Sequence, residues 1–188
     1  MKTKCLFLDR DGVVNYDYGY VHERTNFDFV EGIFDLVKRA NELSYLVIIV
    51  TNQAGIGHGY YSEEDFYSLS NWMIEAFNFQ GCRINDVYFC PYHPSAALPK
   101  YRRFSADRKP EPGMILTAMS KYNIDAKQSV LIGDKQTDIQ AGSSAGIKSL
   151  YLLKTTLDAE KSSRHYESQA KTIHSLEEVD LSNTRLHR

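Results

Sequence analysis

Two closely spaced aspartates after a short apolar run are the residues of this chain best suited to chemistry. The run Cys5-Leu6-Phe7-Leu8 is followed directly by Asp9-Arg10-Asp11-Gly12. A carboxylate can act as a nucleophile, and a second one two residues on can transfer a proton or hold a metal. Gly12 allows a tight turn that points backbone N–H groups at an anion. Taken alone, the pattern is equally typical of two solvated aspartates at a strand end, so both interpretations stay open at this point.

Three further polar residues are expected at the same edge of a sheet. The apolar run at residues 46–50 ends at Thr51, and the run at residues 129–132 ends at Gly133-Asp134. Lys109 stands just before a predicted helix that begins near residue 112. The carboxyl ends of parallel strands share one crevice, so carboxylates, a hydroxyl and an ammonium would gather there. Carboxylates favour a divalent metal, and the other two groups favour an anion. A phosphoryl group on magnesium satisfies both demands, because phosphoryl transfer depends on positioning and charge neutralisation.

Alternating strands and helices predict an α/β fold: a doubly wound, mostly parallel, Rossmann-like sheet with helices on both faces. Apolar runs typical of buried strands cover residues 5–8, 46–50, 87–90, 129–132 and 150–153, and Thr172-Ile173 could add another. Helical spacing of apolar residues covers 33–43, 66–77 and 113–122, and a further helix is expected after Asp134. We therefore expect five to six strands. The predicted elements fill the stretches between the polar strand ends, so no separate cap domain is expected.

Length and composition indicate one soluble domain. The 188 residues predict a single domain over 1–188, in which 155–188 form a polar C-terminal extension. A net charge of −2 gives no basic footprint for nucleic acid, and no apolar run is long enough to span a membrane. Three cysteines without close pairing and no apolar N-terminal segment favour the cytoplasm. We expect a cytoplasmic monomer without nucleic-acid or membrane partners.

Four motifs, in this order, resemble the haloacid-dehalogenase-type phosphatases. They are Asp9-Arg10-Asp11-Gly12-Val13, Thr51-Asn52-Gln53, Lys109 and Gly133-Asp134-Lys135-x-x-Asp138. The resemblance covers roughly residues 4–153, and it implies a magnesium-dependent phosphatase. The alternative from another class is a non-catalytic scaffold built on the same fold.

The resemblance implies a role for each motif residue. Asp9 would be the nucleophile that forms an aspartyl-phosphate, and Asp11 would be the general acid and base. Thr51 and Lys109 would hold the phosphoryl group. Magnesium would be bound by the side chains of Asp9 and Asp134 and by the main-chain carbonyl of Asp11. Two residues, Lys135 and Asp138, would support these groups without binding the metal.

A closer resemblance is to the branch that holds D-glycero-D-manno-heptose 1,7-bisphosphate 7-phosphatases and histidinol-phosphate phosphatase domains. The matching segments are residues 17–21, 51–57, 90–94 and 108–113. In that branch the substrate contacts would be Asp17, Tyr18, Gly19, Tyr20, Asn52, Gln53 and Arg108. The implied reaction is removal of the C7 phosphate of the heptose bisphosphate. Histidinol phosphate or another small phosphorylated sugar is the alternative substrate.

Positive charge favours the bisphosphate. A basic cluster precedes Lys109, and a second phosphate needs cations beyond that lysine, whereas histidinol phosphate carries a cationic amine. The members of the cluster are Lys100, Arg102, Arg103 and Arg108, with His58 as a further candidate. A merely solvated basic face is the alternative.

One departure from the branch concerns zinc. The related proteins carry a loop with Cys-x-His followed by Cys-x-Cys, whereas this chain keeps only Cys90 and has Tyr92, Ser105 and Asp107 at the other places. Those replacements are poor zinc ligands, so we expect no zinc; an altered site of Cys90, His93 and Asp107 is the alternative. The loop at residues 91–112 would then be held by its five prolines and by packing of four aromatic residues in or beside it, Tyr88, Tyr92, Tyr101 and Phe104.

Overall fold

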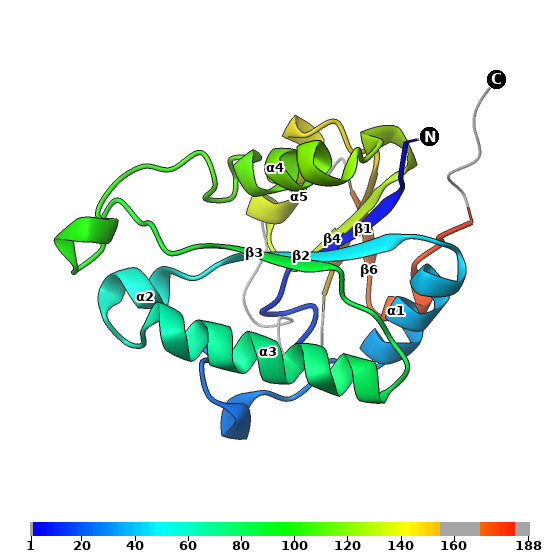
Figure 1. Ribbon diagram of the computed structural model, residues 1–188. Coiled ribbons are helices and arrows are strands. Elements are labelled where there is room, and N and C mark those ends of the chain that lie inside the picture. Colours follow the sequence, from blue (N-terminus) through cyan, green and yellow to red (C-terminus); the bar gives the residue numbers. More distant parts are fainter. Residues whose placement is uncertain (1, 155–169, 183–188) are drawn as a thin grey trace.

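A six-stranded parallel sheet forms the centre of the protein (Figure 1). The computed structural model describes residues 2–154 and 170–182. The strand order is β3-β2-β1-β4-β5-β6, and every neighbouring pair is parallel. The strands are β1 Cys5–Leu8, β2 Leu46–Asn52, β3 Asp86–Cys90, β4 Val130–Gly133, β5 Ser149–Leu153 and β6 Lys171–Ile173. The predicted doubly wound α/β sheet is confirmed.

Helices cover both faces of the sheet (Figure 1). One face carries α1 Ile33–Glu42 and α3 Glu63–Phe79, and the other carries α4 Gly113–Tyr122 and α5 Gln136–Ser144. The short helix α2 Ala54–His58 follows β2 directly. Short 3₁₀ turns lie at Arg24–Asn26, Pro99–Tyr101, Ala126–Gln128 and Leu176–Glu178. Among residues 2–154 and 170–182 no separate cap domain is inserted, as predicted, and no helix is both long and apolar enough to cross a membrane.

The first strand shows why its sequence is apolar throughout. Leu6 and Leu8 face the core beneath α1 and α3, whereas Cys5 and Phe7 face the core beneath α4 and α5. All four side chains are fully buried. A strand covered on both faces has no solvent side, so its sequence does not alternate. Burying one such aliphatic or aromatic side chain contributes about 1.5–3 kcal/mol, which anchors the strand end that carries Asp9.

Residues 170–182 belong to the fold. β6 pairs with Tyr151–Leu153 of β5, which confirms the suggested sixth strand. Leu176, Val179 and Leu181 are buried in the core that contains α1. Residues 170–182 of the expected polar extension are therefore structural, while its residues 155–169 and 183–188 lie outside the described part of the chain.

The proline-containing loop before α4 is held by fewer aromatic contacts than predicted. Tyr101 is buried, and its hydroxyl donates to Glu63 Oε1 at 2.6 Å. Tyr92 packs against the Tyr101 ring and lies under the Arg103 guanidinium. The prediction that Phe104 packs this loop is wrong, because its side chain is 88% exposed.

Candidate active site

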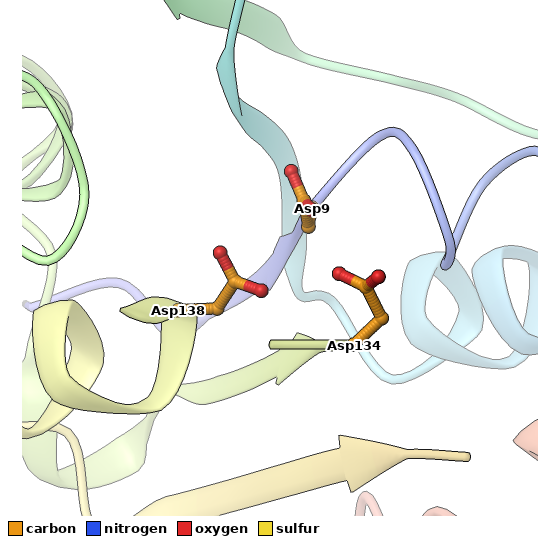
Figure 2. Close-up of side chains that lie close together, drawn as sticks. All are labelled: Asp9, Asp134 and Asp138. Atoms are coloured by element: carbon orange, nitrogen blue, oxygen red, sulfur yellow. The ribbon is translucent and has the colours of Figure 1, made fainter. Parts of the chain in front are cut away.

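Three aspartates converge at the carboxyl edge of the sheet (Figure 2). Asp9 follows β1, Asp134 follows β4, and Asp138 lies in the first turn of α5. Each offers a carboxylate oxygen within 4.8 Å of those of the other two. The parallel pairing of β1 with β4 brings the first two together, as the strand ends predicted.

A buried lysine joins two of these carboxylates. Lys109 Nζ lies 2.7 Å from Asp9 Oδ1 and 2.7 Å from Asp138 Oδ1. Asn52 holds the lysine backbone on both sides: its Oδ1 accepts from Lys109 N and its Nδ2 donates to Lys109 O, each at 3.0 Å. Burial alone would lower the pKa of Lys109, but Asp138 and Asp9 outweigh it and raise the pKa. Lys109 is therefore a fixed cation beside Asp9.

The single positive charge of Lys109 does not neutralise the charges of three carboxylates. Burial, followed by the charges of Asp9 and Asp138, raises the pKa of Asp134 to about 9. Burial raises the pKa of Asp9 to about 6, although Lys109 opposes this rise. Asp134 Oδ1 is buried and has no hydrogen-bond partner among the described residues. An unpartnered buried oxygen in an all-oxygen, net-negative cluster fits a divalent cation such as magnesium.

Asp9 and Asp134 are better placed than Asp138 to bind that cation. Both oxygens of Asp138 are already engaged, since Oδ1 pairs with Lys109 and Oδ2 accepts from Lys135 N at 3.0 Å. The geometry agrees with a supporting role for Asp138. Gly12, with a φ of +97°, makes room for Asp134, because a Cβ there would lie 2.4 Å from Asp134 Oδ2.

The Asp11 carboxylate is turned toward a set of hydrogen-bond donors. Arg10 Nη2 donates to Oδ1 at 2.9 Å and to Oδ2 at 3.0 Å, and Asn15 Nδ2 donates to Oδ1 at 3.0 Å. Gln53 Nε2 donates to Oδ2 at 3.0 Å. Arg10 is itself buried, with a further hydrogen bond to Val21 O at 2.6 Å. Arg10 and Asn15 were not predicted as site residues, although the position of Arg10 between the two aspartates was an available signal.

A cleft of about 420 Å³ opens onto these groups, which is large enough for a small metabolite. The predicted residues that line it are Asp9, Asp11, Asp17, Gly19, Tyr20, Thr51, Asn52, Gln53, Arg108, Lys109, Lys135 and Asp138. Sequence reasoning missed the lining residues Ala54, Tyr61 and Thr137. Tyr18 is absent from the lining: its side chain is 55% exposed and its hydroxyl donates to Asp28 Oδ2 at 3.0 Å.

Positively charged residues at the cleft are fewer than the basic cluster suggested. Of its four members only Arg108 lines the cleft, where its Nη1 also donates to Tyr92 O at 3.2 Å. Arg102 donates instead to the carbonyls of Ala96 and Ala97 within its own loop. Lys135 adds a second cation at the rim, with Nζ 2.9 Å from Asp17 Oδ2 and 3.5 Å from Asp134 Oδ2. This ion pair ties the residue 17–20 loop to the start of α5.

Comparison with known proteins agrees with this geometry. A family model described as HAD-hydrolase-like matches residues 106–179. The chain is 54% identical over 153 residues, 81% of each chain, to D-glycero-alpha-D-manno-heptose-1,7-bisphosphate 7-phosphatase of Burkholderia mallei. It is 42% identical over 155 residues to the D-glycero-beta-D-manno-heptose-1,7-bisphosphate 7-phosphatase of Vibrio cholerae, covering 82% of this chain and 83% of the other.

A solved structure extends the likeness to the fold. The D,D-heptose 1,7-bisphosphate phosphatase of B. bronchiseptica, crystallised with magnesium and phosphate, superposes with a TM-score of 0.76 at 26% identity. The match covers 93% of this chain and 94% of that one. This chain therefore belongs to the heptose-bisphosphate phosphatase family of HAD-like hydrolases.

Proposed function

We propose that this protein is a magnesium-dependent phosphatase that removes the C7 phosphate of D-glycero-D-manno-heptose 1,7-bisphosphate. The observation that carries the proposal is that Asp9 and Lys109 line one cleft, with the Asp134 carboxylate grouped beside that of Asp9, in a chain 54% identical to a phosphatase named for this substrate. The B. bronchiseptica relative, whose structure holds magnesium and phosphate, supports the choice of metal and of reacting group.

Asp9 is the nucleophile in this proposal. One of its carboxylate oxygens attacks phosphorus, and the bond between phosphorus and the C7 oxygen breaks as the aspartyl-phosphate forms. Lys109 Nζ, 2.7 Å from Asp9 Oδ1, neutralises charge on the transferring group, and the Thr51 hydroxyl at the cleft wall donates to it. When bound by Asp9 and Asp134, magnesium supplies further positive charge for the phosphoryl oxygens.

Asp11 moves the protons. It gives a proton to the C7 oxygen as the sugar leaves, and it then takes a proton from the water that attacks the aspartyl-phosphate. The second step releases inorganic phosphate and restores the carboxylate of Asp9. Arg108 and Lys135, the other cations that line the cleft, are suited to the distant phosphate of a bisphosphate.

The test is phosphate release from the heptose bisphosphate, with magnesium, with excess chelator, and with the Asp9→Asn variant. The wild type should release phosphate only with magnesium, and chelated enzyme should recover when magnesium is restored. Asp9→Asn should fold normally and lose turnover, because an amide is not a nucleophile. Retained turnover in the variant, with deamidation excluded by mass spectrometry, would contradict the covalent mechanism. Activity in excess chelator would contradict the metal assignment.

A further inference from the structure

Gln53 lies between two groups of the proposed reaction. It is 1% exposed, and its Nε2 donates to Asp11 Oδ2 at 3.0 Å and to Thr51 Oγ1 at 2.8 Å. Its Oε1 accepts from the Tyr61 hydroxyl at 2.5 Å. Both N–H groups of the amide are thus engaged by protein atoms, although the resemblance made Gln53 a substrate contact.

Tyr61 occupies a closely fitted position behind this amide. Its ring lies against Gly55, where a Cβ would come within 2.2 Å of Tyr61 Cε1, so any side chain at 55 would push the ring aside. The His22 ring stacks on Tyr61, with centroids 4.8 Å apart and planes 5° apart. Burial raises the pKa of Tyr61, so its hydroxyl keeps its proton and remains a donor. The ring and its hydroxyl are therefore fixed from more than one side.

A protonated phenol that donates to an amide must meet the carbonyl end. The Asp11 carboxylate can only accept, so it requires the N–H end of Gln53, and the Tyr61 hydroxyl stabilises the same orientation by donating to the carbonyl end. The inverted amide would place a carbonyl oxygen against the Asp11 carboxylate, with no hydrogen between them. Arg10 and Asn15 hold Asp11 Oδ1, and Arg10 also reaches Oδ2. Gln53, which directly follows the strand β2 that carries Thr51, donates to Oδ2 as well.

We propose that Gln53, oriented by Tyr61, is a positioning residue that holds the Asp11 carboxylate for proton transfer. The inference rests on the proposed function, in which Asp11 protonates the leaving alcohol. Gln53 and Tyr61 line the cleft, but their polar atoms are engaged by protein groups, so in this account they act through Asp11. The second hydrogen bond of Gln53, to Thr51, would affect the holding of the phosphoryl group instead.

The chemistry supplies a readout specific to Asp11. An alkoxide leaves badly and needs the proton, whereas p-nitrophenolate leaves readily and needs it little. The constant kcat/KM reports the steps up to formation of the aspartyl-phosphate. Misplacing Asp11 should therefore lower kcat/KM for an alkyl phosphate and spare kcat/KM for p-nitrophenyl phosphate. General folding damage, or a fault in holding the phosphoryl group, would lower both alike.

The experiment compares Gln53→Met and Tyr61→Phe with wild type on the heptose bisphosphate, an alkyl phosphate, and on p-nitrophenyl phosphate. Gln53→Met should lose roughly tenfold or more of kcat/KM on the alkyl substrate and less than about threefold on the aryl one. Tyr61→Phe, which removes one hydroxyl and keeps the ring, should show the same selectivity with a smaller loss. Tyr45→Phe is the matched control. It also removes the hydroxyl of a buried tyrosine, which donates to Leu181 O at 2.9 Å, but Tyr45 precedes the amino end of β2, whereas Gln53 follows the carboxyl end. It should leave both constants unchanged.

Asp11→Asn separates this inference from the proposed function. If Asp11→Asn is selective for the alkyl substrate and Gln53→Met and Tyr61→Phe are not, the positioning role is wrong while the acid role stands. If Asp11→Asn itself loses both activities equally, the acid role on which the inference rests is wrong. The positioning assignment would be overturned if each variant lost kcat/KM equally on the alkyl and the aryl substrate, or if neither variant lost any.

Discussion

Asp134 places a buried oxygen without a partner beside two further carboxylates. Its pKa is raised from 3.8 to about 9 by burial and then by Asp9 and Asp138. An acid with a raised pKa in the folded state binds its proton more tightly when folded. Its contribution to stability is fully present below the unfolded pKa and is lost as the pH rises toward the folded pKa. Without metal, the stability that protonated Asp134 contributes is therefore lost progressively as the pH rises from about 4 to about 9.

Asp134→Asn should remove the part of that pH dependence that lies above the pKa of Asp9, which is about 6. In metal-free protein, the melting temperature of the wild type should fall from about pH 5 to about pH 8, and the variant should melt higher at the upper pH. The variant should also lose the rise in melting temperature that magnesium gives the wild type. Asp65→Asn is the control, since hydrogen bonds from Ser62 lower the pKa of Asp65 and it titrates below this window. A wild-type slope retained in Asp134→Asn would contradict the electrostatic account of the site.

Arg108 should distinguish a bisphosphate from a simple phosphate. It lines the cleft, so Arg108→Ala removes a charge suited to the distant phosphate. We expect kcat/KM for the heptose bisphosphate to fall roughly tenfold to a hundredfold, with a smaller loss on p-nitrophenyl phosphate. Arg103→Ala is the matched control, because that guanidinium lies 3.8 Å from the centre of the Tyr92 ring and does not line the cleft. Equal losses on both substrates would show that Arg108 acts only on the transferring phosphoryl group.

At the scale of elements, helix α5 lies close to β4 and β5 at two glycines. A Cβ on Gly133 would lie 2.2 Å from Asp138 Cβ, and a Cβ on Gly142 would lie 2.7 Å from Leu150 Cδ2. The first contact adjoins the ion pair of Asp138 with Lys109, whereas the second lies in the apolar core.

Alanine at these two glycines should therefore separate activity from stability. Gly133→Ala should displace Asp138 and lower kcat at least tenfold in molecules that remain folded. Gly142→Ala should lower the free energy of unfolding by about 1–3 kcal/mol with kcat nearly unchanged. Urea unfolding and steady-state kinetics on both variants make the comparison. A Gly133→Ala enzyme with wild-type kcat would show that the position of Asp138 is not critical.

The loop before α4 should fold without zinc. Cys90 Sγ approaches Tyr92 O at 3.9 Å, and the group of three metal-ligating residues found in the described part of the chain is Asp9, Asp134 and Asp138. Structural zinc needs several thiolate or imidazole ligands, and its binding energy is then folding energy. Elemental analysis of protein purified without an affinity tag should find no stoichiometric zinc. One zinc per chain, with a lower melting temperature after its removal, would contradict this prediction.

For the whole molecule, the sheet was more predictable than the site. Runs such as residues 5–8 are apolar at every position because both faces of the sheet are covered, and that pattern is visible in the sequence. Parallel pairing then brings the strand-end residues Asp9 and Asp134 together without further information. Which aromatic residues of the loop before α4 are buried could not be predicted from such a pattern. Tyr101 is buried and donates a hydrogen bond to Glu63, which lies 38 residues earlier in the sequence, whereas Phe104 in the same loop is exposed to solvent.

The supporting residues of the site were hidden for the same reason. In the sequence, Tyr61 is an aromatic residue beside a glycine-rich turn, and nothing there indicates a polar contact. Its role depends on the position of the Gln53 amide in the folded chain. A monomeric state and a cytoplasmic location remain predictions from composition and cysteine content.

The position of the phosphate removed is the most direct test of the proposed function. Purified enzyme with magnesium should be given D-glycero-D-manno-heptose 1,7-bisphosphate and, separately, histidinol phosphate, with products followed by phosphorus NMR. We predict loss of the C7 phosphomonoester signal, persistence of the C1 phosphate, and a kcat/KM at least a hundredfold higher than for histidinol phosphate, the selectivity that about 2.7 kcal/mol of differential binding provides. Loss of the C1 phosphate, or a preference for histidinol phosphate, would contradict the proposed function.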